Sequence, residues 1–378
     1  MTPQRWIHSL VVVGIGLIAL NAGAVQTAVR CDRLLDSPGR VVIESTDMAY
    51  LRDEARFAEG PAPQKNMGTV EIVEQFHFND QSAQALHLKG ELIKRYAPNV
   101  VQIKKGHARH VLSAAREQFE FLLSELPQSQ PEHFRREGHL LHNLLNNVTV
   151  SLADFEPGVP ARHALAQLAL LVAEDLIFMK QDSKSGEFQI IGGALAYPTY
   201  WSLDYFLGHS IASIHKNISS TPEKSVQFAQ MINRILARNL ENPTVVRRNN
   251  WFIQWDARYS LPDPVFASQA QEPYPYPQRI DRRNYLDRLF LRVERQTLRG
   301  LPQSKVVVFA ILPFVYSINR VTSDPVAAAN LRDGLRVKTM PRPRSENEHH
   351  VRTLYKYLSQ DFPVLAEQAS PASTAIQP

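Results

Sequence analysis

Residues 291–302, LRVERQTLRGLP, place charged and amide side chains at every second position of a predicted strand. Successive side chains of a strand point to opposite faces of a sheet, so Arg292, Glu294 and Gln296 share one face. The other face carries Leu291, Val293, Arg295 and Thr297. Two arginines, a carboxylate and an amide do not suit an ordinary apolar core. The polar face is therefore either hydrated or part of a site that needs polar groups.

Helical patterns dominate the chain before residue 180, and strand patterns dominate after it. Apolar periodicity predicts helices over 81–94, 107–126, 132–146 and 162–180, and a further helix over 222–240. Short apolar runs predict strands over 187–197, 242–256, 288–298 and 304–318. We therefore expect an α+β fold, in which helices wrap a mainly antiparallel sheet.

The first 30 residues form an apolar segment with the core LVVVGIGLIAL. A cleaved signal peptide fits, because Ala22, Gly23 and Ala24 resemble a cleavage site. A membrane anchor also fits and is preferred, with the body on the cytosolic side; secretion after cleavage is the alternative. After it we expect an irregular linker over 31–66, one main domain over 67–335, and a C-terminal helix with a disordered tail over 336–378.

Composition excludes several functions. The formal net charge is +5 in 378 residues, which does not indicate nucleic-acid binding. Cys31 is the single cysteine, so the chain alone cannot build a disulfide framework or an iron–sulfur cluster. His139 and His142 have a spacing that could share a metal on a helix, but no third ligand is evident, and an ordinary helix face is the preferred interpretation.

His215 is the histidine with the most suggestive surroundings. It follows Ile211 and Ile214 on a predicted short helix. An imidazole on an apolar helix face is a common axial ligand of haem iron, but spacing alone favours an ordinary packed histidine.

Four segments together resemble the haem-dependent oxidative N-demethylase family, α-subunit type. They are AEDLIFM (173–179), YPTYW with SIASIH (197–201 and 210–215), RRNNWFIQ (247–254) and LRVERQTLRGLP with the apolar strand after it (291–316). Their order and spacing agree with the family over about 65–335. The sequence differs from the family pattern at two places. After His215, KNIS replaces a proline-containing stretch, and Gly300 stands where the family has a second arginine.

The resemblance implies a PAS-like antiparallel sheet that holds haem b. It implies an oxygenase that removes a methyl group from a small secondary amine such as dimethylamine, using O2. The electrons would come from NADPH through a separate flavin and iron–sulfur reductase partner. The departures from the family text are compatible with a bulkier amine or another small metabolite.

The resemblance also assigns residues. It makes His215 the metal ligand, and it places Trp251, Arg292 and Gln296 with His215 around the cofactor. Arg248 and Glu294 become the catalytic pair, in which the arginine polarises bound dioxygen and the carboxylate holds a protonated amine. Both could instead form a structural ion pair.

Two other functions remain open at this point. A haem-binding PAS domain can act as a sensor without turnover, because a fold does not fix a function. A chain of the same fold could also have lost haem and serve as a scaffold. No output module of a sensor is visible in the sequence, so we favour the oxygenase.

Overall fold

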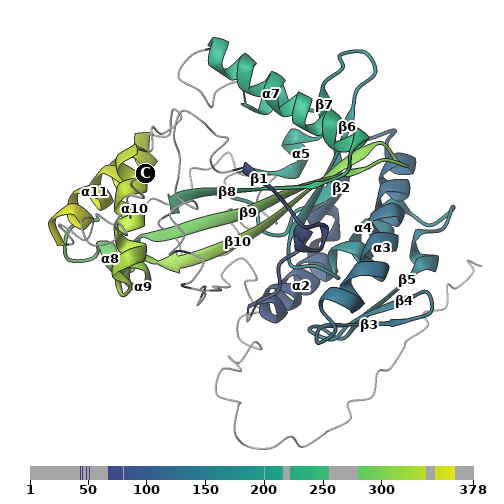
Figure 1. The fold of residues 1–378 in the computed structure, drawn as a ribbon, viewed down its shortest axis with the longest axis horizontal. Helices are drawn as coiled ribbons and strands as arrows, with labels where there is room; N and C mark the ends of the chain where they lie inside the picture. Colours follow the sequence, from purple (N-terminus) through teal and green to yellow (C-terminus); the bar gives the residue numbers. More distant parts are fainter. Residues whose placement is uncertain are drawn as a thin grey trace, which may run out of the picture. The chain divides into compact units, whose positions relative to one another are not determined.

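The computed structural model describes residues 67–79, 81–199, 201–215, 222–254, 280–337 and 345–361, together with Ile43, Ser45, Met48 and Leu51. Its centre is a seven-stranded antiparallel sheet in the order β1-β8-β9-β10-β6-β7-β2 (Figure 1). The strands are β1 (Met67–Val70), β2 (Val101–Ile103), β6 (Asp175–Gln181), β7 (Phe188–Ala194), β8 (Val245–Gln254), β9 (Phe290–Leu301) and β10 (Val306–Ser317). The predicted α+β class is confirmed.

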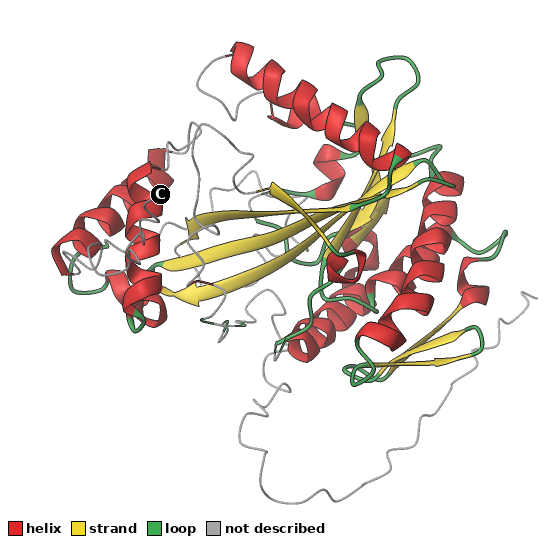
Figure 2. Ribbon diagram, viewed as in Figure 1, coloured by secondary structure: helices red, strands yellow, loops and turns green. Residues whose placement is uncertain are grey.

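Helices surround this sheet, and a small second sheet lies beside them (Figure 2). The longer helices are α2 (Ser82–Val100), α3 (Ala108–Ser129), α4 (Ala161–Ala169), α7 (Pro222–Glu241), α10 (Pro325–Val337) and α11 (Ser345–Asp361). The short ones are η5 (Ile72–Gln75), η6 (Leu152–Phe155), α5 (Leu203–Phe206), α6 (Ile211–His215), α8 (Tyr285–Arg288) and α9 (Ile318–Thr322). The second sheet is the meander β3 (Phe134–Glu137), β4 (Leu140–Asn143) and β5 (Val148–Ser151).

The register of β9 divides the large sheet into two faces. Residues directly opposite each other in neighbouring strands point to the same side. Gln296 lies opposite Arg248 on β8 and Ile311 on β10, and Ile311 lies opposite Asp175 on β6. We call this side the Glu294 face; its members on β8 and β9 are Val246, Arg248, Asn250, Phe252, Arg292, Glu294, Gln296, Leu298 and Gly300.

Different helices cover the two faces. On the Glu294 face, a buried apolar cluster joins the sheet to α5, α6 and α7 through Leu203, Ile211 and Leu236. On the opposite face, Arg295 and Thr297 bind the carbonyl of Gln75 in η5, and Arg299 binds Gln118 on α3. Strand β9 is therefore buried along nearly its whole length although it carries three arginines.

Two predicted helices are wrong. The segment 132–146 forms β3, β4 and their turn, because Gly138 adopts a positive φ of 57° and Leu141 and Asn143 alternate inward. The segment 162–180 is a helix only as far as Ala169, and its second half is strand β6. That half is apolar on all sides because β6 is buried on both faces of the sheet, and such a pattern can be mistaken for a buried helix.

Within the part of the chain that the structure describes, no helix combines the length and the apolar character needed to cross a membrane. The predicted anchor or signal segment, 1–30, lies outside that part.

Gly300 supplies the close contact between β9 and α7. A Cβ atom at this position would lie far inside van der Waals contact with the carbonyl of Asn239, and the Gly300 amide donates to the Asn239 side chain. We therefore expect Gly300→Ala to lower the free energy of unfolding by about 2–4 kcal/mol, since helix and strand must move apart. Urea unfolding followed by circular dichroism measures the change.

Gly90→Ala is the matched control. Gly90 lies within α2, and a Cβ atom there would meet only Leu170 at 3.7 Å. The midpoint urea concentration of unfolding of this variant is expected to equal or exceed that of the parent. Alanine is more favourable than glycine inside a helix by about 1 kcal/mol. Equal stability of the Gly300→Ala variant and the parent would show that α7 does not pack as described.

Candidate functional site

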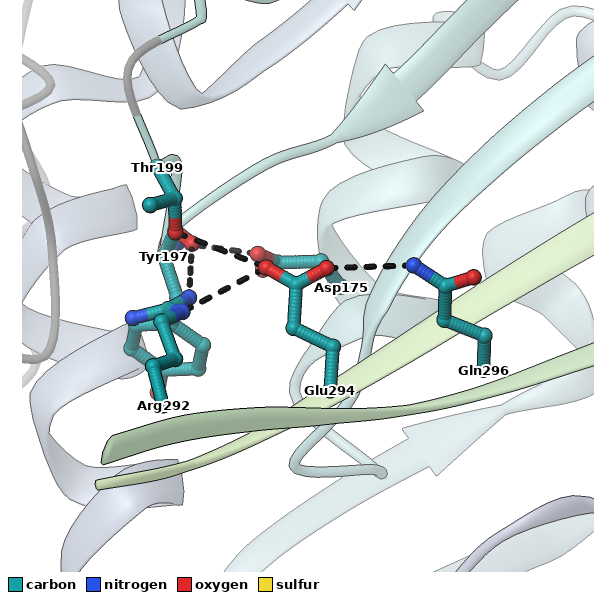
Figure 3. A network of polar contacts seen from close by, with 6 residues as sticks. All are labelled: Asp175, Tyr197, Thr199, Arg292, Glu294 and Gln296. Carbon is teal, nitrogen blue, oxygen red and sulfur yellow. Dashed lines mark hydrogen bonds and ion pairs between the residues drawn. The ribbon is translucent and has the colours of Figure 1, made fainter. Parts of the chain in front are cut away.

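Glu294 is the centre of a hydrogen-bonded network on its face of the sheet (Figure 3). One carboxylate oxygen accepts from Arg292 Nε at 3.3 Å and from Thr199 Oγ1 at 3.5 Å. The other accepts from Gln296 Nε2 at 3.1 Å. The Glu294 residue is only 8% exposed, so its carboxylate needs these donors to compensate for lost hydration. The contacts are long, and a carboxylate can accept about four hydrogen bonds, so one more donor can be accommodated.

Arg292 links this carboxylate to the neighbouring chain segment. Its side chain is fully buried, and Nη2 donates to the carbonyl of Tyr197 at 2.8 Å while Nε faces Glu294. A buried guanidinium is tolerated only when its charge and donors are matched. The pair of Glu294 and Tyr197 provides that match, and it fixes the end of the Arg292 side chain beside the carboxylate.

Asp175 holds the other end of the same network. Its two carboxylate oxygens accept from the backbone amides of Ala196 at 2.8 Å and Tyr197 at 2.9 Å. These bonds fix the segment that carries the Tyr197 carbonyl and the Thr199 hydroxyl, and both of these groups contact the Arg292–Glu294 pair. Burial raises the pKa of Asp175 to about 6, although Lys89, the two amides and Arg292 oppose this shift.

Lys89 of α2 is a second buried cation near the network. Its ammonium donates to the carbonyls of Val172, Ala173 and Glu174 at 2.9, 2.9 and 2.5 Å. Burial lowers the pKa of Lys89 to about 8, and Asp175 and Glu174 partly counteract this effect. The lysine therefore fixes the turn that leads into β6 and favours a charged Asp175.

The structure brings four of the predicted site residues to one face. These four are Arg248, Arg292, Glu294 and Gln296. Arg292 and Gln296 contact Glu294 directly, and Arg248 lies opposite Gln296 on β8. The side chains of Val246, Arg248, Asn250 and Phe252 are only partly buried, in contrast to their neighbours on β9. Access to Glu294 from solvent is therefore expected on the β8 side.

Trp251 does not share this face. It lies opposite Val293, is fully buried, and points to the same side of the sheet as Arg295. The structure thus separates Trp251 from the residues with which the family resemblance grouped it.

His215 is the last residue of α6, one helical turn after Ile211, whose side chain is buried in the apolar cluster. The side chain of His215 lies outside the described part of the structure.

Sequence reasoning missed Asp175, Thr199 and Lys89. Asp175 and Thr199 stand in the segments AEDLIFM and YPTYW, so their presence in those segments was the available signal. Lys89 gave no signal, because its partners are backbone carbonyls.

The structure places His142, the other histidine considered as a metal ligand, in a different element from the one predicted. His142 lies on strand β4 and not on a helix, and its ring contacts Thr149 Oγ1 at 2.8 Å and Glu137 at 3.5 Å. Among the described residues, no group of three or more histidine, cysteine, aspartate or glutamate side chains could hold a metal ion.

The structure thus defines an α+β protein in which a buried carboxylate, bound by an arginine, an amide and a hydroxyl, lies beside a large apolar cluster. The family model that matches the chain is described as haem-dependent oxidative N-demethylase, alpha subunit-like, and it covers residues 68–365. This range is most of the chain, and the chain belongs to that family. The family resemblance of the sequence is confirmed, and it makes the protein a haem-dependent oxidoreductase of the oxidative demethylase type.

The role of Asp175 can be tested with Asp175→Asn. An amide can accept from only one of the two backbone N–H groups and removes the charge that faces Lys89 and Arg292. We expect the free energy of unfolding to fall by about 2–4 kcal/mol at pH 7, as for other broken buried networks. Thermal and urea unfolding measure it.

The pH dependence has a defined sign. The folded pKa of Asp175, about 6, lies above its ordinary value of 3.8, so the folded state binds more protons than the unfolded state between these values. The contribution of Asp175 to stability therefore decreases as pH rises from about 4 to about 6. The stability difference between parent and Asp175→Asn should narrow over this window by about 1–3 kcal/mol. A constant difference would contradict the assignment.

Proposed function

We propose that the chain is a haem-dependent oxygenase that removes an N-methyl group from a small amine. The observation that carries this proposal is the buried Glu294 carboxylate, held by Arg292, Gln296 and Thr199 on the sheet face covered by α6. The family match supports haem as the cofactor and oxidative demethylation as the reaction type.

The described residues fit a haem group by their chemistry. A porphyrin needs apolar surface, and the cluster on the Glu294 face provides it through Leu298, Ile311 and Ile211. Iron needs an axial ligand, for which we propose His215 at the end of α6. Arg248 and Arg292 lie on the same sheet face as this cluster and add positive charge beside it. We take the group to be haem b in a PAS-like sheet.

When bound, the haem would supply the activation of O2. In the net reaction, an N-methylated amine, one O2, two electrons and two protons give the demethylated amine, formaldehyde and water. One oxygen atom enters a C–H bond of the methyl group, the C–N bond then breaks, and the nitrogen takes up the proton that the new hydroxyl group loses as formaldehyde forms. The two electrons need a reductant, which we take to be NADPH acting through a flavin or iron–sulfur protein. The chain has one cysteine and cannot carry such a cluster itself.

The residues of the chain have separate tasks in this reaction. Glu294 accepts a hydrogen bond from the substrate ammonium group, and its charge favours the protonated amine. Arg292 and Gln296 hold that carboxylate in one orientation. To Arg248, which lies opposite Gln296 on the neighbouring strand, we assign the donor that polarises the reacting oxygen. The substrate class is a small methylated amine with at least one N–H group in its protonated form.

His215→Ala tests the cofactor. The purified full-length parent, expressed with a haem precursor, should show a Soret band, and the variant should lose it or bind haem at least about tenfold more weakly, because the axial bond is absent. The visible spectrum and haem titration measure this. His209→Ala on the preceding turn is the control and should retain the parent spectrum. A parent without haem would contradict the oxygenase and leave a scaffold role.

Glu294→Gln tests the substrate site. The amide keeps the size of the side chain and removes its charge, so formaldehyde release from dimethylamine and larger methylamines should fall by about 10²-fold or more while the Soret band remains. Glu137→Gln, an exposed position on β3, should be as active as the parent. Undiminished turnover in Glu294→Gln would contradict the role of the carboxylate, and haem without any turnover in the parent would favour a sensor.

A further inference from the structure

A group of cations lies at one end of the large sheet. They come from three regions that are separate in the sequence: the β2–α3 connection with the first turn of α3, the end of β6 with the β6–β7 hairpin, and the turn between β9 and β10. We call this group the basic rim; it consists of Lys104, Lys105, Arg109, Lys180, Lys184 and Lys305. Lys105, Arg109, Lys184 and Lys305 are exposed, and the other two are half-buried.

The cations of the rim are close enough to affect one another. Lys305 ends the turn into β10, and its neighbour Val306 lies opposite Lys180. Burial and then the charge of Lys305 lower the pKa of Lys180. Burial, followed by Lys104, His110 and Lys180, lowers the pKa of His107 in the same region. Like charges are therefore concentrated across elements that are distant in the sequence.

The rim lacks internal compensation. Among the described residues, none of its six members forms an ion pair with a carboxylate; Lys104 donates instead to the amide of Gln189 at 2.9 Å. Asp182 lies nearby, but its carboxylate accepts from the backbone of Lys184 and from Ser185 within the hairpin. Glu117 likewise accepts from the backbone amides of Gln303 and Ser304. Both acids keep their charge in these hydrogen bonds, and Asp182 interacts electrostatically with Lys104, but the six cations of the rim outnumber these two acids.

Two backbone features increase this effect. Helix α3 begins at Ala108, so the positive end of its dipole adds to the field of the rim. Lys305 has a φ of 55°, a left-handed conformation that glycine or asparagine adopts more readily. Lys305 is exposed in the turn between β9 and β10, where a partner can contact its charge.

The rim is continuous with the segment that leads to His215. The Lys104 side chain lies against Gly208, where an added Cβ would be 3.0 Å from Lys104 Cε. Gly208 and His209 bind the backbone of Ile190, and Ser210 pairs with Gln189 immediately before α6. Tyr205, on α5, is 68% exposed and packs on His209 at a ring distance of 5.3 Å. Cations and an exposed aromatic ring thus border the α5–α6 turn.

We propose that the basic rim, with Tyr205 at its border, is the docking surface for an acidic electron-carrier protein of the flavin or iron–sulfur class. This inference rests on the proposed function, because the oxygenase reaction consumes two electrons that the chain cannot store. Opposite charges accelerate and orient the encounter of such proteins. An anionic membrane would also attract the rim, but it would require no relation to α6, whereas an electron donor must approach the segment that carries the iron ligand.

The test measures binding directly. The probes are an acidic ferredoxin and an acidic flavodoxin, titrated against the full-length chain by biolayer interferometry at low and at about 0.3 M salt. We expect micromolar binding to at least one probe at low salt, and weaker binding at high salt. The triple variant Lys105→Glu/Lys184→Glu/Lys305→Glu should bind at least about tenfold more weakly. The control Arg135→Glu/Arg136→Glu, at exposed positions on β3 of the second sheet, should bind as the parent does.

Two further binding measurements distinguish a failure of the docking proposal from a failure of the proposed function. His215→Ala should bind the probes as the parent does, so loss of haem and loss of docking are distinguishable. Vesicles of about 30% phosphatidylserine in phosphatidylcholine test the lipid alternative. Absence of binding to both proteins, equal binding by the triple variant and the parent, or rim-dependent binding to vesicles alone would each overturn the proposal.

Discussion

The buried guanidinium of Arg292 is the constraint on which the site depends. A fully buried cation is stable only if a carboxylate and a carbonyl meet it in fixed positions. Glu294 supplies the carboxylate from the same strand, and Tyr197 supplies the carbonyl from the segment after β7. That carbonyl stays in place because Asp175 binds the backbone amides of Ala196 and Tyr197. Strands β6 and β9 and the segment between β7 and α5 therefore order one another, and Thr199 reaches Glu294 as a consequence.

Consecutive acids at the start of β6 serve opposite faces of the sheet. Asp175 acts on the Glu294 face, whereas Glu174 accepts from the backbone amide of His77 at 2.8 Å beside η5. Burial raises the pKa of Glu174, and Arg295, whose side chain binds carbonyls of η5, is the largest opposing influence. Since side chains alternate along a strand, two adjacent carboxylates can organise both layers through different backbone amide donors. The polar residues of β9 and β6 thus replace part of the apolar packing that normally joins helices to a sheet.

The sequence was informative where the signal was local. The alternation in LRVERQTLRGLP predicts both strand β9 and the shared face of Arg292, Glu294 and Gln296, which the structure reproduces. The position of Trp251 required the register between β8 and β9, since a strand's period says only that Trp251 and Arg248 differ in face. Asp175 could not be assigned from its own surroundings, because its partners are backbone amides 21 and 22 residues later. The helix expected over 132–146 failed because its short apolar run fits both periods, and the turn at Gly138 decided between them.

The basic rim and the Glu294 network lie at different positions along the large sheet. Glu294 precedes Leu301, the last residue of β9, by seven positions, which corresponds to about 23 Å at the usual rise of a strand. The turn that carries Lys305 begins beyond Leu301. A protein bound at the rim would therefore leave the partly exposed β8 side of the Glu294 face accessible to a small amine. The apolar cluster lies between these two regions on the same face, and it includes Leu298 of β9 and Ile211 of α6. If the cofactor binds beside this cluster, the proposed electron donor and the substrate would approach it from different regions of the surface.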